Sequence, residues 1–437
     1  MRSLNLRRYG KQLLLLCVYL FALEISCWAM LSALNAKVLW YGFPVEQLLS
    51  SKKYKSSFFL TEEKGELISK PKLVMHPYLG YVKNIRNNNS TATGSMFSLG
   101  FTSYMPLQKE RSTEKVIIGI FGGSLAMQFY GEGGKTLQNA LQSAPAFKGK
   151  EIILQNVSIG GYKQPQQLMS LIYIMLQGGV FDIVLNIDGF NEVVLPAQEN
   201  IPHGVHPLFP RNWWSRSDFH VNDPVKLGFL GRISLLDQRR NLYRHKVRNA
   251  PWKYSFTAQF LWHFLDRYLE RSILHNRKEI DAIIARSGQN YETSGPLQKY
   301  ENNDVLMRDL VRIWSESSQL IQNISTTQNM LYIHVLQPNQ YVENSKPMGA
   351  AERDIAYNEK NPYGLWVKRG YPLLREEGIA LSERGVRFHD MTMVFQGTEK
   401  PLYKDDCCHF NTEGYKQFAR ALAPIIIKEY REWQISY

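Results

Sequence analysis

Short runs of β-branched and other apolar residues recur along this 437-residue chain, with helical patterns between them. These runs are Val116–Phe121 (VIIGIF), Ile152–Val157, Ile183–Ile187, Met330–Leu336 and Val386–His389. Continuous apolar runs of this length are typical of strands that are buried on both faces of a parallel sheet. Because helical patterns follow them in place of hairpin turns, we expect right-handed βαβ units. The pattern therefore predicts an α/β domain.

The helical patterns lie at about 125–143, 164–177, 303–325 and 412–430. A stretch from about 193 to 301, rich in Trp, Arg and His, interrupts the alternation after the third strand and predicts an insertion with one helix at 256–286. Its segment 226–286 carries 13 Lys and Arg against 5 Asp and Glu, so much of the net charge of +13 is concentrated there. An anionic polymer or lipid headgroups are the expected partners of such a face; a merely solvated basic face is the alternative.

The N-terminus carries a long apolar run at residues 12–34, which follows Arg2, Arg7, Arg8 and Lys11. About 20 apolar residues cross a bilayer core, and the positively charged flank stays cytoplasmic. We expect a cytoplasmic tail at 1–11, a transmembrane signal anchor at 12–34 and a body outside the cytoplasm (periplasmic, extracellular or lumenal). Because a carboxylate is costly in mid-membrane, we expect Glu24 to be protonated or paired with a partner helix. The alternative is a cleaved signal peptide, which is favoured if only Leu13–Leu23 is embedded.

Residues 35–114 are polar and irregular, which predicts a stem with a few short strands, and residues 115–435 then form the α/β domain. Four cysteines are too few for a disulfide framework. Two of them lie in the apolar run, and the other two, Cys407 and Cys408, are adjacent. That pair can form a strained vicinal disulfide or remain two packed thiols.

Four polar or glycine-rich segments follow the predicted strands or precede the last helix. Ser124 follows two glycines at the start of a helix, where its hydroxyl is exposed beside partial positive charge. Gly161 can present a backbone N–H, and Asn191 can donate an amide N–H to an oxyanion or cap the next turn. Asp406, three residues before His409, can accept from the imidazole Nδ1–H and leave Nε2 facing the serine.

Together these segments resemble the SGNH (GDSL-like) hydrolase superfamily. The matching blocks are Phe121–Ser124, Ser158–Gly161, Gly189–Glu192 and Asp406–His409, with Gly123 and Glu192 where the family usually has Asp. The resemblance implies a flavodoxin-like three-layer α/β/α domain that needs no cofactor or metal. It also implies Ser124 as nucleophile, His409 as general base and Asp406 as the orienting carboxylate. The implied oxyanion hole comprises the Ser124 and Gly161 N–H groups and the Asn191 side chain.

Other readings account for fewer of these residues. An α/β-hydrolase elbow would need glycine where Ala126 stands. His203 and His206 are spaced like metal ligands but have no clear third partner, and no nucleic-acid recognition motif is present.

The sequence thus predicts a serine-dependent O-acyl (acetyl) esterase or acyltransferase that acts on an acylated carbohydrate of the cell envelope or an extracellular polysaccharide. The alternative is a non-catalytic protein of the same fold that binds or helps assemble an anionic surface polymer. The expected partners are the ester substrate, the membrane through residues 12–34, and an anionic polymer at the basic insertion.

Overall fold

The computed structural model describes residues 2–34, 58–63, 66–71, 73–84, 99–217, 224–248, 252–287 and 291–436. The chain divides into two compact units. Residues 1–72 and 219–288 form the first, here called the anchor unit, and residues 73–218 and 289–437 form the second, the sheet unit. Much of the predicted stem, at 35–57 and 85–98, lies outside the described residues.

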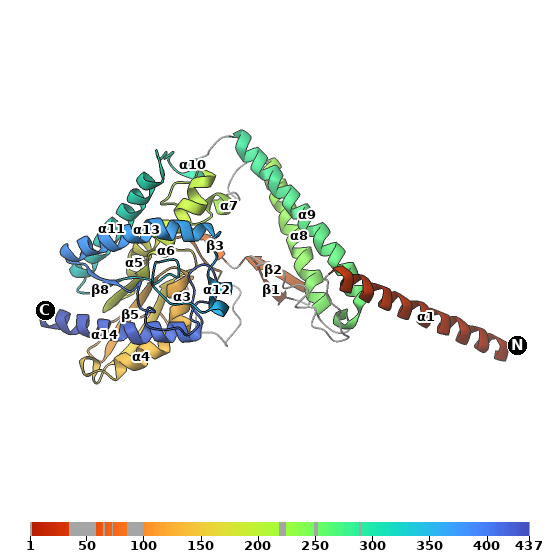
Figure 1. Cartoon of the computed structure of the whole chain (residues 1–437), viewed down its shortest axis with the longest axis horizontal. Helices are drawn as coiled ribbons and strands as arrows, with labels where there is room; N and C mark the ends of the chain where they lie inside the picture. The colour runs from red at the N-terminus through yellow and green to blue at the C-terminus, as the bar shows by residue number, and fades with distance from the viewer. Residues whose placement is uncertain are drawn as a thin grey trace. The chain divides into compact units, whose positions relative to one another are not determined.

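The sheet unit is built on five parallel strands in the order β6-β5-β7-β8-β9 (Figure 1). The strands are β5 (Lys115–Gly122), β6 (Glu151–Ser158), β7 (Ile183–Asp188), β8 (Leu331–Leu336) and β9 (Arg387–Asp390). These bounds confirm the five predicted strands. The register pairs Gly122, the last residue of β5, with Ser158 on β6 and Ile187 on β7, so these strands end at one edge of the sheet.

Helices cover both faces of this sheet. On one face lie α3 (Ser124–Glu132), α4 (Gly134–Gln142) and α14 (Thr412–Ser436); on the other lie α5 (Gln166–Leu176), α11 (Asn303–Thr327) and α13 (Pro362–Glu383). Alternate residues of each strand enter one of two hydrophobic clusters: Ile117 packs with α5 and α11, whereas Ile118 packs with α3 and α14. The α/β prediction is therefore confirmed, with a helical layer on each side of a parallel sheet.

One predicted helix is divided and another helix was not predicted. The helix expected at 125–143 is split into α3 and α4 at Gly133, where a Cβ would lie 2.7 Å from the Tyr415 carbonyl oxygen, so a side chain there would clash with α14. The helix α13 begins at Pro362, in a part of the chain for which no helix was predicted. Its signal was Asn361-Pro362, because Asn361 caps the helix and Pro362 is its first residue.

Shorter elements complete the sheet unit. The hairpin of β3 (Leu73–His76) and β4 (Gly80–Lys83) lies within residues 35–114, where a few short strands were expected. The short helices are α6 (Phe190–Leu195), α7 (Trp213–Ser217), α10 (Tyr291–Ser294) and α12 (Ala350–Ala356).

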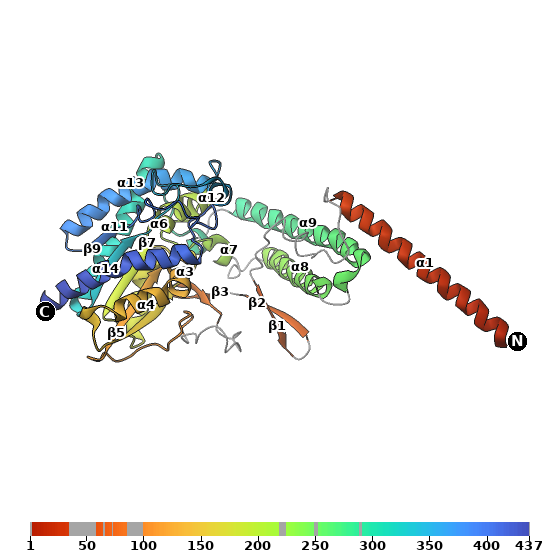
Figure 2. The same ribbon diagram turned by 60° about the horizontal axis from the view of Figure 1, so that its bottom comes forward.

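The anchor unit contains α1 (Arg2–Leu34), the hairpin of β1 (Phe58–Glu63) and β2 (Glu66–Pro71), and the helices α8 (Pro224–Arg248) and α9 (Phe256–Ser287). Figure 2 shows α8 and α9 side by side, as in Figure 1. α9 matches the predicted helix, whereas α8 was not predicted. Among the described helices, α1 is long and apolar enough to cross a membrane, over residues 11–33.

Candidate active site

Ser124 is the first residue of α3 and is partly exposed at the edge of the sheet where β5 ends. Gly122 makes the turn possible: its φ is +139°, and a Cβ there would lie 2.2 Å from the Ile187 carbonyl oxygen. A side chain is therefore excluded both by backbone conformation and by space. The turn places the Ser124 hydroxyl at a helix N-terminus, where partial positive charge favours a developing anion.

His409 faces this serine from the loop that precedes α14. Its Nε2 lies 2.7 Å from Ser124 Oγ, and its Nδ1 lies 2.7 Å from a carboxylate oxygen of Asp405. The His409 side chain is 16% exposed, so a substrate can reach the ring while most of it is held by packing. The predicted pairing of Ser124 with His409 is therefore present, across 285 residues of sequence.

The carboxylate that contacts His409 is Asp405, and the prediction of Asp406 for this position was wrong. Asp405 Oδ2 faces the imidazole, while its Oδ1 accepts the backbone N–H groups of Cys407, Cys408 and His409 at 3.1–3.2 Å. An Asp side chain that accepts the N–H groups of the residues after it builds a tight turn. The residue that begins the turn is therefore the one whose carboxylate lies beside the ring.

The environment of Asp405 keeps it ionised. Burial alone would raise its pKa, but the hydrogen bond from His409, the attraction of that ring and the backbone N–H donors outweigh burial and lower the pKa to about 2. An ionised Asp405 accepts the Nδ1 proton of His409. That hydrogen bond leaves Nε2 free of its proton and able to accept one from Ser124.

Asn191 lies on the other side of the serine turn, in α6 after β7. Its side-chain nitrogen donates to the Tyr162 carbonyl oxygen at 2.6 Å, and a Cβ on Gly123 would lie 2.0 Å from that nitrogen. The Asn191 amide therefore packs directly against the backbone just before Ser124. One of its two N–H bonds is used by Tyr162, and the second can donate to an oxyanion.

The turn after β6 also reaches Ser124, through the residue before the predicted glycine. A Cβ on Gly160 would lie 3.8 Å from Ser124 Cβ, whereas a Cβ on Gly161 would meet Arg211 and Tyr81. Gly161 has a φ of +84°, so its role in the turn is to reverse the chain. An oxyanion contact from the Gly161 N–H stays a prediction.

The loop that carries His409 is held closed at both ends. Tyr403 and Phe410 pair across it as an isolated antiparallel bridge. Glu352, buried on α12, accepts the backbone N–H groups of Leu402 and Tyr403 at 2.7 and 2.8 Å and forms a buried ion pair with Lys346 at 2.7 Å. These contacts fix His409 before any substrate arrives.

Cys407 and Cys408 lie inside the same loop as free thiols, with 3.1 Å between the two sulfur atoms. Together with His409 they could supply three metal ligands. Two observations disfavour a metal. Both ring nitrogens of His409 are already committed to Asp405 and Ser124, and burial raises the pKa of Cys408, which disfavours the thiolate that a metal needs.

A second Ser-His-Asp group, which the sequence analysis missed, lies in the core of the sheet unit. His334 Nε2 is 2.9 Å from Asp188 Oδ1, and His334 Nδ1 is 2.8 Å from Ser318 Oγ. Trp314 also donates to Asp188 at 2.8 Å. The side chains of Ser318 and His334 are fully buried, so this group cannot meet a substrate. Its sequence signal was weak because Ser318 and His334 lie inside α11 and β8, while Asp188 is the last residue of β7.

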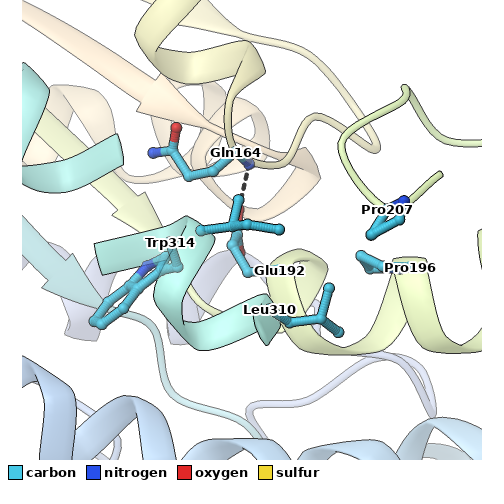
Figure 3. A pocket seen from close by; sticks show the side chains of 7 residues that line it. Gln164, Glu192, Pro196, Pro207, Leu310 and Trp314 are labelled. Carbon is cyan, nitrogen blue, oxygen red and sulfur yellow. Dashed lines mark hydrogen bonds between the residues drawn. The ribbon is translucent and has the colours of Figure 1, made fainter. Parts of the chain in front are cut away.

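Neither of two cavities in the sheet unit is lined by Ser124. One is a small space of about 10 Å³, enough for a single water, lined by Gln164, Glu192, Pro196, Pro207, Leu310, Ile313 and Trp314 (Figure 3). In it, burial and the charge of Asp188 raise the pKa of Glu192 to about 8. The other is an open hollow of about 730 Å³ between the 340–348 segment, α12 and α13. Gln340 and Tyr341 line this hollow and hydrogen-bond the backbone carbonyls of Asp405 and Asp406.

The Ser124 site thus combines a hydroxyl, an imidazole oriented by a carboxylate, and nearby N–H donors, which is the equipment for nucleophilic acyl transfer. No protein-family model and no curated protein matches the sequence. The functional argument therefore rests on this geometry.

Proposed function

We propose that this protein is a serine-dependent O-acyl esterase or acyltransferase of the SGNH type. The observation that carries the proposal is the continuous chain of contacts from Ser124 Oγ to His409 Nε2 and from His409 Nδ1 to Asp405, each 2.7 Å long, at a partly exposed edge of the sheet. Serine hydroxyls are weak nucleophiles unless a base is in contact, and here the base is itself oriented.

In the proposed reaction, Ser124 Oγ bonds to the carbonyl carbon of the ester while His409 Nε2 takes the hydroxyl proton. The ester C–O bond then breaks, and the same proton passes to the departing alcohol oxygen. Water or a sugar hydroxyl attacks the carbonyl carbon of the resulting acyl-Ser124 and gives its proton to His409. The bond from that carbon to Ser124 Oγ then breaks, and His409 returns the proton to Ser124 Oγ. Asn191 and the backbone N–H of Ser124 stabilise the negative oxygen of each tetrahedral intermediate.

A polar, bulky substrate suits the surroundings of the site better than a lipid ester. The open hollow of about 730 Å³ that adjoins the His409 loop is lined by tyrosines together with Arg353, Lys368 and Arg375. Aromatic faces with charged and amide groups are suited to sugar rings that carry anionic substituents. We therefore propose an acylated carbohydrate as the substrate, which agrees with the proposal that α1 crosses the membrane and holds the body outside the cytoplasm.

A serine-reactive fluorophosphonate tests the proposal on the full-length protein in detergent. We expect covalent labelling at Ser124 that Ser124→Ala and His409→Ala both abolish. Folded wild-type protein that takes up no label would contradict an activated serine and favour a non-catalytic binding or assembly protein. Product analysis with an acetylated oligosaccharide, with and without a sugar acceptor, then separates hydrolysis from acyl transfer.

A further inference from the structure

The end of α8 and the start of α9, residues 243–248 and 252–268, form a hairpin tip that packs against α1. The Glu24 carboxylate of α1 accepts hydrogen bonds from the Ser255 hydroxyl at 2.5 Å and from the Phe256 backbone N–H at 2.7 Å. It thereby caps the N-terminus of α9. Next to this cap, Cys27 and Leu31 are buried against Phe256. Glu24, whose carboxylate is costly in an apolar helix, thus has a structural role in joining α1 to α9.

The position of this contact along α1 determines where the hairpin tip lies relative to the apolar span of that helix. Every residue of α1 from 11 to 23 is exposed, and burial begins at Glu24. The apolar span runs from 11 to 33, so the tip lies beside its second half while the first half extends alone (Figures 1 and 2). At about 1.5 Å per residue, Glu24 lies roughly 14 Å before the end of that span.

The hairpin tip exposes several large apolar and aromatic side chains. They are Tyr243, Trp252, Tyr254, Leu261, Phe264 and Tyr268. The first ten residues of α9 contain no Lys, Arg, Asp or Glu. The first charged residue is Asp266, about 15 Å along the helix from Phe256, and it is paired with Arg240 at 2.6 Å.

We propose that the hairpin tip docks into the bilayer–water interface beside the C-terminal half of α1, with phospholipid as its partner. Trp and Tyr favour this zone because one end of each ring is apolar and the other polar. The exposed Lys246 and Arg267 have side chains long enough to reach lipid phosphates while their stems lie along apolar surface. The inference rests on α1 crossing the membrane and is independent of the chemistry at Ser124.

Photo-crosslinking from matched positions on α9 tests this docking in the full-length protein. Benzoylphenylalanine replaces either Leu261, which is 64% exposed in the hairpin tip, or Leu274, which is 50% exposed on the same helix about 20 Å farther along. The protein is reconstituted in liposomes of phosphatidylcholine and phosphatidylglycerol that contain an alkyne-tagged phosphatidylcholine. We expect several-fold more lipid adduct from position 261 than from position 274.

The proposal would be overturned by equal lipid adducts from the two positions or by no adduct from position 261. Capture of an added anionic polysaccharide at position 261 in place of lipid would also overturn it. Glu24→Ala supplies a second readout. It should lower the adduct from position 261 while α1 stays resistant to alkaline extraction from the liposomes. An unchanged adduct would contradict the role given to the α1–α9 contact in setting the level of the tip.

Discussion

The sheet unit contains two Ser-His-Asp groups with nearly the same contact distances and opposite surroundings. In the first, Ser124, His409 and Asp405 lie on turns and loops at an edge of the sheet, where each side chain is partly exposed. In the second, Ser318, His334 and Asp188 lie on α11, β8 and β7 and are buried. Contact distance alone therefore does not distinguish a catalytic group from a structural one.

The two groups differ in the other hydrogen bonds that their side chains make. Both carboxylate oxygens of Asp188 accept hydrogen bonds from buried donors. Oδ1 accepts from Trp314 and His334, and Oδ2 accepts from Asn186. The buried serine also contacts the Tyr332 hydroxyl at 3.1 Å. Such a network satisfies polar groups that the core would otherwise leave unpaired. In the other group, Ser124 is partly exposed and lies at the start of α3, beside the Asn191 amide.

The largest expected difference between the two groups is in catalysis. Ser124→Ala removes the proposed nucleophile and should lower the turnover of a nitrophenyl acetate by about 10⁴-fold or more. Ser318→Ala should leave turnover near the wild-type rate but lower the free energy of unfolding by about 1–3 kcal/mol, because it leaves a buried ring nitrogen without its partner. Steady-state rates and urea unfolding of both variants provide the check. Turnover retained by Ser124→Ala, or lost in folded Ser318→Ala, would reverse the assignment.

A smaller catalytic loss is expected at the carboxylate. Asp405→Asn presents an amide N–H to His409 Nδ1 and so favours the tautomer whose Nε2 carries a proton, which should reduce kcat by up to about 10⁴-fold. Asp406→Asn is the matched control one residue away, and its kcat should stay close to wild type. A larger loss in Asp406→Asn than in Asp405→Asn would restore the assignment that the sequence suggested.

The smallest expected effect is on the pH dependence of stability. Asp405 has a folded pKa of about 2, below its ordinary value of 3.8, so its ionised form stabilises the fold fully above the ordinary value and loses that effect as pH falls toward 2. The difference in apparent Tm between wild type and Asp405→Asn should therefore shrink between about pH 6 and about pH 3. A difference that grows on acidification would mean that Asp405 is not the stabilised carboxylate.

The parallel sheet was predictable because its signal is local. Each of the five strands is a continuous apolar run, and burial on both faces demands that composition. The helix α8 was missed because its apolar residues do not form one clear stripe among its many basic ones. The break at Gly133 did have a local signal that the prediction passed over, because Gly131, Gly133 and Gly134 lie within four residues and glycine is unfavourable inside a helix.

At the candidate site, sequence order was enough to bring Ser124 and His409 together, since strand ends and the last loop meet at one edge of a parallel sheet. The carboxylate was placed one residue too far along because spacing does not reveal which of two adjacent Asp side chains turns inward. Asp405 is the inward-facing carboxylate because its side chain accepts hydrogen bonds from three backbone N–H groups of the turn. The buried Ser318 group left no pattern, because its polar side chains interrupt otherwise apolar elements.

Gly123 is expected to be intolerant of substitution. Its φ of −92° lies outside the left-handed region that favours glycine. Glycine is required by the Asn191 amide, whose nitrogen occupies the place of a Cβ. Every missense change of this codon, even to alanine, must therefore displace Asn191 or the serine turn. No amino-acid substitution at the position before the proposed nucleophile is therefore conservative, because every residue other than glycine adds a Cβ.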